Sequence, residues 1–199
     1  MKVLVTGFEQ FGGNTTNVSS EVASTFSSNS IDGCEIVVAQ LPVSFMRVRD
    51  ELARLIEQHQ PNVILLLGQA GKREHISIER IAVNLMDSKM GDNDGFCPNE
   101  QSIIPNAENA YFSNLPLKQI VENCRHEGIE MTISNTAGLY VCNCTLYHAL
   151  HIAYTQNSDC KIGFIHLPKI IDYERKTKLL KYMHKAIKIA LTPLIFKTH

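Results

Sequence analysis

The apolar run over residues 63–68 (VILLLG) is the longest in the chain, and it constrains the fold more than any other feature. Apolar side chains at consecutive positions are typical of a strand that is buried on both faces, as in the centre of a parallel sheet. The run is far shorter than the ~20 residues that a membrane-spanning helix needs. The sequence therefore predicts a buried central strand over residues 63–67.

Strands and helices are predicted to alternate around this central strand. The other strands are expected at residues 1–6, 35–43, 76–85, 130–134 and 161–167. Helices are expected at residues 21–28, 44–59, 115–127 and 141–154. A last helix is expected to begin at its N-cap, Asp172, with an inner stripe of Leu179, Leu180, Met183, Ile187, Ala190, Leu191 and Leu194. This alternation predicts one α/β domain over residues 1–199 with a largely parallel sheet, and residues 91–109 are expected to form a long loop.

The composition argues against several classes of protein. Lys and Arg number 19 and Asp and Glu number 20, and a formal charge of −1 does not fit a nucleic-acid-binding surface. The N-terminal apolar run meets Gly7 and Glu9 too early for a signal peptide, so we expect a cytoplasmic protein with no membrane segment. In that compartment the six cysteines are expected to be free thiols.

The N-terminal motif GFEQFGG follows the first expected strand and lacks the spacing of known phosphate-binding loops. A Walker loop needs Gly-Lys-Ser/Thr before a helix, and a dinucleotide-binding turn needs G-x-G-x-x-G. The motif instead carries Phe8 and Phe11 on a glycine-rich loop. Ligand pockets form at the carboxyl ends of parallel strands, so the two rings are candidates for an apolar pocket. The alternative is that one or both rings belong to the core.

Cys142 is the most informative position for chemistry. The segment SNTAGLYVCN (residues 134–143) predicts a strand, a turn of small residues and then a helix, with Cys142 at the helix N-terminus. Unpaired N–H groups and the helix dipole favour a thiolate there, and the same N–H groups can receive an oxyanion. An inert buried cysteine is the alternative.

A metal site is a second alternative for the same segment. Cys142, Cys144, His148 and His151 offer four ligand side chains on one expected helix. Zinc sites usually use C-x₂₋₄-C, and the two sulfurs of C-x-C on a helix point ~200° apart. The spacing therefore favours the thiolate over the metal.

His166 and Glu79 are candidate partners for a cysteine nucleophile. His166 lies at the carboxyl end of an expected strand, in GFIHLP, and a core histidine is the alternative. Glu79 lies inside an apolar segment, where a charge is costly unless it is paired. Arg80 points to the opposite face of a strand, so a histidine is the expected mate of Glu79.

Six segments in order resemble the pyrrolidone-carboxylate peptidases (pyroglutamyl peptidases I) over about residues 1–168. They are GFEQFGG, GQAGKREHISIERIAVN, DND, AYFSNLP, SNTAGLYVCN and GFIHLP. The resemblance implies a cytosolic cysteine peptidase that removes N-terminal pyroglutamate from peptides. It also implies a compact single-domain α/β/α sandwich and a homotetramer, with no cofactor and no metal.

The resemblance also implies roles for individual residues. Cys142 matches the family nucleophile, His166 the general base and Glu79 the residue that orients the histidine, with a thioester as the intermediate. Further residues are implied at the substrate pocket: Phe8 and Phe11 around the lactam ring, Gln69, Tyr140 and Val141, and Lys89 at the position of a family arginine.

Several positions depart from the family pattern. Gln10, Val18 and Gly91 stand where proline is usual, Cys144 is unusual so close to the nucleophile, and residues 169–175 differ from the customary tail. Lost prolines leave loops more freedom. A catalytically weakened relative that binds a pyroglutamyl-like ligand is therefore the alternative to an active peptidase.

Overall fold

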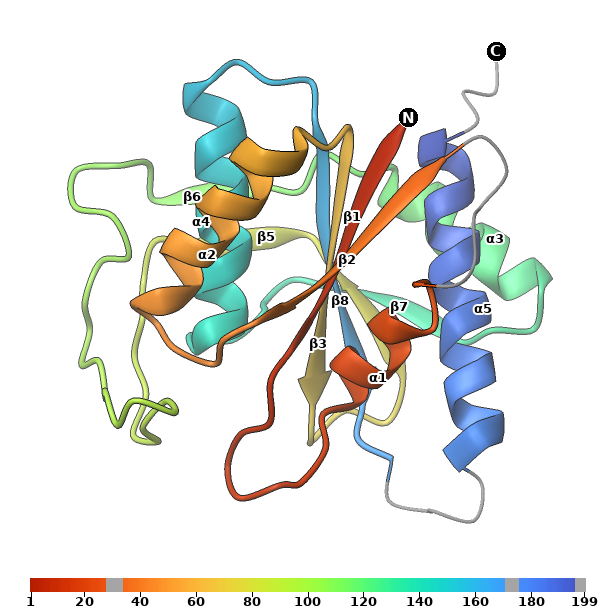
Figure 1. The fold of residues 1–199 in the computed structure, drawn as a ribbon, viewed down its shortest axis with the longest axis horizontal. Coiled ribbons are helices and arrows are strands. Elements are labelled where there is room, and N and C mark those ends of the chain that lie inside the picture. Colours follow the sequence, from red (N-terminus) through yellow and green to blue (C-terminus); the bar gives the residue numbers. More distant parts are fainter. Residues whose placement is uncertain (28–33, 171–175, 196–199) are drawn as a thin grey trace.

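Helices cover both faces of a central sheet in this chain. The computed structural model describes residues 1–27, 34–170 and 176–195. Within these ranges five helices pack on a six-stranded sheet, which confirms the expected single-domain α/β/α sandwich (Figure 1). Over the same ranges no helix combines the length and the apolar character needed to cross a bilayer.

The central sheet is mostly parallel and has the strand order β2-β1-β3-β8-β4-β7. Its strands are β1 (Lys2–Phe8), β2 (Glu35–Leu41), β3 (Val63–Ala70), β4 (Ile76–Glu79), β7 (Met131–Ser134) and β8 (Lys161–Pro168). The first three and β8 run parallel, whereas β4 is antiparallel to β8 and parallel to β7. The run predicted as the central strand lies in β3, between β1 and β8, and its side chains over Val63–Leu67 are at most 1% exposed.

The five helices form the outer layers. They are α1 (Val18–Ser24), α2 (Arg47–His59), α3 (Leu117–His126), α4 (Val141–Thr155) and α5 (Lys176–Ile195). Helices α2 and α4 cover one face of the sheet, and α1, α3 and α5 cover the other (Figure 1). The predicted inner stripe of α5 is confirmed, since Met183, Ile187, Ala190 and Leu191 are buried and Leu179, Leu180 and Leu194 pack against the same core. The expected cap, Asp172, lies outside the described residues.

Helices α1, α2 and α3 begin at residues other than those the sequence suggests, and a side-chain cap explains the shift of α1. Helix α1 begins at Val18 because Asn17 caps it: its Oδ1 accepts a hydrogen bond from the Ser19 N–H at 3.0 Å. Helix α2 begins at Arg47 rather than at Ser44, and its N-cap, Met46, makes no side-chain hydrogen bond to it. Ser44 lies before the helix, where its Oγ accepts from the Arg47 N–H at 3.1 Å.

Residues 76–85 do not form one strand, and this prediction was wrong. The segment breaks at the exposed Arg80 into β4 and β5 (Ile81–Val83), and β5 pairs with a strand that the sequence did not reveal, β6 (Ala110–Phe112). The Arg80 N–H donates to the Ser134 carbonyl at 2.8 Å, while its own carbonyl accepts from the Ser113 N–H at 2.9 Å. The backbone therefore changes partner at this residue.

The connection from β5 to β6 is the expected long loop, and it is fixed at several points. Met86 and Gln101 form an isolated bridge. The Asn84 side chain donates to the Ile104 carbonyl at 2.8 Å and accepts from the Ile104 N–H at 2.9 Å. These contacts bring the loop back against the layer that contains α2 and α4.

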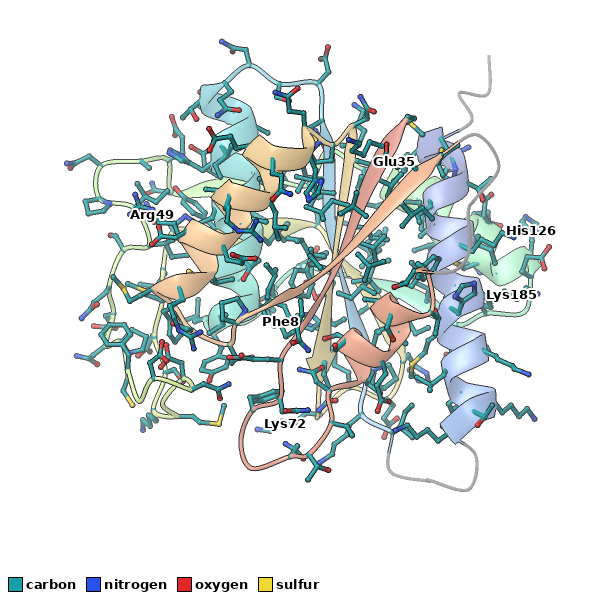
Figure 2. All side chains as sticks on the ribbon, in the orientation of Figure 1. Phe8, Glu35, Arg49, Lys72, His126 and Lys185 are labelled. Carbon is teal, nitrogen blue, oxygen red and sulfur yellow. The ribbon has the colours of Figure 1, made fainter. Side chains whose placement is uncertain are left out.

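The carboxyl ends of β1, β3 and β8 meet at one edge of the sheet. Figure 2 shows Phe8 and Lys72 at this edge and Glu35 at the opposite one. Gly7 allows the edge to form: a Cβ on it would lie 2.5 Å from the Ser19 carbonyl oxygen and from the Ser20 Cα and N. Helix α1 thus packs directly on the backbone of β1.

We predict that Gly7→Ala lowers the free energy of unfolding by about 1–3 kcal/mol, because the clashing atoms are backbone and cannot rotate away. Gly71→Ala is the matched control, since a Cβ at Gly71 meets nothing within 4 Å. Urea unfolding of both variants measures the difference. Equal midpoints for the two variants would contradict the close approach of α1 to β1.

Candidate active site

Cys142 lies in the first turn of α4 and faces a cavity at the carboxyl edge of the sheet. The cavity has a volume of about 380 Å³. It is lined by Phe8, Phe11, Asn17, Val43, Gln69, Ala70, Gly71, Lys72, Arg73, Thr136, Ala137, Gly138, Tyr140, Val141, Cys142 and His166. Segments from β1, β3, β8 and the loop before α4 therefore meet around the sulfur of Cys142.

His166 and Glu79 form a buried pair beside this cavity. The His166 Nδ1 donates to the Glu79 Oε1 at 2.7 Å, Glu79 is 0% exposed, and His166 is 4% exposed. A carboxylate only accepts hydrogen bonds, so the Nδ1 carries the proton and the Nε2 keeps a lone pair. The expectation that a histidine pairs with Glu79 is confirmed.

Cys142 and His166 lie on the same face of the sheet. Gly68 is the register partner of His166 on the neighbouring strand, and a Cβ at Gly68 would lie 3.1 Å from the Cys142 Sγ. His166 follows Phe164 on the face covered by α2 and α4, and the two rings are 4.7 Å apart. The absence of a side chain at Gly68 leaves room for the sulfur beside the histidine.

Arg73 is a partner of Glu79 that sequence reasoning missed. Its Nη1 lies 2.7 Å from the same Glu79 Oε1 and also contacts the Ser77 Oγ, and its Nη2 donates to the Thr136 carbonyl at 2.8 Å. Arg73 precedes β4 in the turn after β3, so strand alternation says nothing about its direction. The one available signal was that Glu79, as a buried carboxylate, needs a cation.

Burial opposes the ionisation of both Cys142 and His166. Burial, and then the charge of Glu79, raise the pKa of the Cys142 thiol to about 12, although Arg73 acts in the other direction. Burial also lowers the pKa of His166, against the effect of its hydrogen bond to Glu79, which raises it. Burial therefore acts against the thiolate that the helix N-terminus favours. A thiolate can form here when the Cys142 proton passes to His166.

The start of α4 offers N–H groups to an anion near Cys142. No side chain caps the helix at Tyr140, and the Cys144 N–H makes the first helical bond, to the Tyr140 carbonyl at 3.2 Å. The buried Asn143 holds this end of the helix, since its Nδ2 donates to the Val83 and Leu85 carbonyls at 2.9 Å each and its Oδ1 accepts from the Val83 N–H at 3.0 Å.

Most of the expected pocket residues line the cavity, with different exposure. Phe8 is only 3% exposed and packs towards Phe164, with 6.3 Å between ring centroids, whereas Phe11 is half-buried. The Gln69 Oε1 accepts from the Val18 N–H at 3.0 Å. The Tyr140 hydroxyl donates to the Gly91 carbonyl at 3.0 Å.

Lys89 is the exception among the expected pocket residues. It is exposed and is not among the residues that line the cavity. It lies on the long loop between β5 and β6, where no buried strand fixes its direction. The structure therefore does not bring Lys89 together with Cys142.

The four residues of the alternative metal site do not converge. The Cys144 Sγ points into the core, 3.8 Å from the Phe45 carbonyl, and the His151 Nδ1 is 2.9 Å from the Tyr111 hydroxyl. His148 is buried. In the part of the chain that the structure describes, no group of three or more His, Cys, Asp or Glu side chains is placed to hold a metal ion.

A larger cavity, of about 700 Å³, lies at the opposite edge of the sheet, between the C-terminal ends of α2 and α4. Cys160 lines it, and burial raises the pKa of this thiol to about 11. None of the described residues that line this cavity is a histidine. It therefore lacks the pairing of a cysteine with a histidine that lines the cavity around Cys142.

Comparison with known proteins gives one consistent match. Residues 1–190 match the family model described as pyroglutamyl peptidase. A pyrrolidone-carboxylate peptidase of Thermococcus kodakarensis is 43% identical over 195 residues, covering 96% of this chain and 94% of that protein. A solved structure of a mutant pyrrolidone carboxyl peptidase from Pyrococcus furiosus superposes with a TM-score of 0.93 at 35% identity, over 100% of both chains. The pyroglutamyl peptidase I of Bacillus amyloliquefaciens gives a TM-score of 0.91 at 36% identity, over 100% of this chain and 95% of that one.

We predict that His148 makes the fold sensitive to acid. Burial, and then Arg49, lower the pKa of His148 to about 4, whereas an unfolded chain restores a value near 6.5. Between these two values the unfolded state binds more protons, so stability falls as the pH falls through this window. His148→Gln should remove about 2 kcal/mol of the difference in unfolding free energy between pH 7 and pH 4.5.

Urea unfolding at the two pH values measures this difference. His126→Gln is the control, because the His126 side chain is 74% exposed. Loss of the same stability between pH 7 and pH 4.5 in wild type and His148→Gln would contradict the prediction.

Proposed function

This chain belongs to the pyroglutamyl peptidase family, and we propose that it removes N-terminal pyroglutamate from peptides by cysteine catalysis. In this proposal Cys142 is the nucleophile, His166 the general base and acid, and Glu79 the residue that orients His166. One observation carries the proposal. Cys142 and His166 line the same cavity, and the described residues around that cavity include no Asp or Glu.

The absence of a carboxylate from the lining suits the substrate. An aminopeptidase that binds an ordinary N-terminus needs a negative group for the ammonium, whereas the lactam of pyroglutamate is neutral. Phe8, Phe11, Val43 and Val141 supply apolar wall around Cys142. A flat, uncharged ring is the ligand that such a wall accommodates best.

The first half of the reaction requires a proton transfer from Cys142 to His166. The His166 Nε2, whose lone pair is free because Nδ1 donates to Glu79, takes the thiol proton as the sulfur attacks the pyroglutamyl carbonyl carbon. Glu79 stabilises the imidazolium that forms. N–H groups at the start of α4, including that of Cys142, receive the oxyanion.

Three further proton transfers complete the cycle. When the C–N bond breaks, the His166 imidazolium gives its proton to the leaving amine, and the pyroglutamyl group remains on sulfur as a thioester. Neutral His166 then takes a proton from water, whose oxygen attacks the thioester. Pyroglutamate leaves, and the proton returns to the Cys142 sulfur.

Hydrogen bonds hold the loops that lack the usual family prolines. The Gln10 carbonyl accepts from the Asn93 Nδ2 at 2.8 Å, and the Gly91 carbonyl accepts from the Tyr140 hydroxyl at 3.0 Å. The Val18 N–H donates to the Gln69 Oε1 at 3.0 Å. These contacts favour an active peptidase over a weakened relative that only binds its ligand.

We predict that Cys142→Ala abolishes the release of chromophore from a pyroglutamyl 4-nitroanilide, with a loss of about 10³-fold or more. Cys144→Ala is the matched control two residues away, because its sulfur lies in the core and burial raises its pKa to about 12. This variant should remain active. Absorbance of the released nitroaniline at micromolar enzyme measures both rates.

The outcomes separate the two readings of the family resemblance. Release that survives in Cys142→Ala would contradict a cysteine mechanism. A wild-type protein that binds pyroglutamate in calorimetry without releasing nitroaniline would indicate the weakened relative instead.

The proposal includes assembly into a cytoplasmic homotetramer, as the resemblance implies. The described surface carries large exposed aromatic side chains at Phe112, 68% exposed, and Tyr154, 60% exposed, which suit burial between subunits. We predict a mass in light scattering of four times the 22.3 kDa of one chain. Phe112→Ser should shift the mass towards smaller species, and a monomeric wild type would contradict the tetramer.

A further inference from the structure

Arg73 joins three parts of the chain that meet around Cys142. It lies in the turn between β3 and β4, where its own N–H donates to the Ala70 carbonyl at 3.1 Å. Its guanidinium, whose side chain is 27% exposed, contacts Ser77 and Glu79 on β4 and the Thr136 carbonyl on the loop before α4. One planar group therefore touches both the base side and the nucleophile side of the site.

The guanidinium and the imidazole share one oxygen atom of Glu79. The Arg73 Nη1 and the His166 Nδ1 each lie 2.7 Å from Oε1. The other oxygen, Oε2, is buried and has no hydrogen-bond partner among the described residues. The position of the carboxylate, and so the direction of the His166 ring, thus depends on the contacts that Arg73 makes.

The contact with Thr136 reaches the segment that leads to Cys142. The Thr136 carbonyl also accepts from the Ser134 Oγ at 3.0 Å, and the Thr136 Oγ1 accepts from the Gly138 N–H at 3.1 Å. Gly138 has a φ of 79°, a conformation that favours glycine. The turn into α4 is thereby tied to the group that fixes Glu79.

The charge of Arg73 also matters, because Glu79 is buried completely. Without a cation, a buried carboxylate would be costly and would oppose a thiolate nearby. Arg73 lowers the pKa of both Cys142 and His166, while Glu79 raises both. Lys72 and Tyr140 are the other titratable groups that line the cavity beside Cys142, His166 and Arg73.

We propose that Arg73 is a positioning residue for catalysis, which fixes Glu79 and the turn before Cys142 and balances the charge of Glu79. This inference rests on the proposed function and assigns a fourth side chain to it. Lysine cannot replace the arginine fully, because one ammonium cannot span Glu79 and Thr136 as a planar fork does. Geometry and charge are therefore separable by substitution.

The test compares Arg73→Met, which removes the fork and the charge, with Arg73→Lys, which keeps the charge. Arg80→Met is the matched control, because Arg80 follows Glu79 and its exposed side chain makes no hydrogen bond or ion pair with the described residues. Two readouts are used as a function of pH: hydrolysis of the pyroglutamyl 4-nitroanilide, and the rate at which iodoacetamide alkylates Cys142, followed by mass spectrometry of its peptide.

Arg73→Met should lower kcat by about 100-fold and change KM by less than about threefold, whereas Arg73→Lys should lower kcat by about 10-fold. In Arg73→Met the acid limb of both profiles should move to higher pH by about one unit, because the cation no longer opposes protonation of His166. Arg73→Lys should keep the limb near its wild-type pH. Arg80→Met should match the wild type in every readout.

A second comparison tests whether Arg73 acts through Glu79. The double variant Arg73→Met with Glu79→Gln leaves no uncompensated buried charge, so it serves even if Arg73→Met alone does not fold. Its kcat should equal that of Glu79→Gln within about threefold, since residues that act as one unit are not additive. Multiplied losses, or a rise in KM, would overturn the proposal and indicate direct contact with substrate.

The two proposals fail in different ways. No hydrolysis by the wild type, or hydrolysis by Cys142→Ala, would contradict the proposed function. The pH profiles of Cys142 alkylation would still test whether Arg73 influences Cys142 and His166. Arg73→Met profiles that equal those of Arg80→Met, with normal hydrolysis, would overturn the inference about Arg73 alone.

Discussion

The site depends on one buried carboxylate oxygen. The Glu79 Oε1 accepts from the His166 Nδ1 and pairs with Arg73 at 2.7 Å each, in a place where Glu79 has no contact with solvent. Because this oxygen fixes the imidazole tautomer, it determines that the Nε2 is the basic atom. A buried pair of opposite charges is costly to form and more costly to break, which keeps the three side chains together. The cavity, Cys142 and His166 lie around this contact.

Local pattern was sufficient to predict the elements that carry the site. A strand, a turn of small residues and a helix are visible in residues 134–143, and the structure has β7, the Gly138 turn and α4 at those positions. The apolar runs that became β3 and β8 were equally clear. The division of residues 76–85 was hidden, because it depends on Ser113 and Ser134, which reach Arg80 from distant parts of the chain. Short β6 had no pattern of its own.

The same difference between local and tertiary effects explains what the sequence did not reveal about the site. The N-terminal position of Cys142 in α4 is local and was predicted correctly, but its burial is tertiary, and burial outweighs the helix end in raising the pKa of the thiol. Arg73 was missed for a related reason. Its partners Glu79 and Thr136 become neighbours only when β4 and β7 pair.

The reversed direction of β4 determines how deeply Glu79 lies beneath His166. Ser77 is opposite His166, so the next residues of this antiparallel strand run inwards, and Glu79 lies farther from the sheet edge than the histidine that it binds. A parallel β4 would carry the same two steps of sequence outwards, towards solvent. Glu79 therefore binds the imidazole from the interior of the protein, so that the other ring nitrogen, Nε2, is on the outer side.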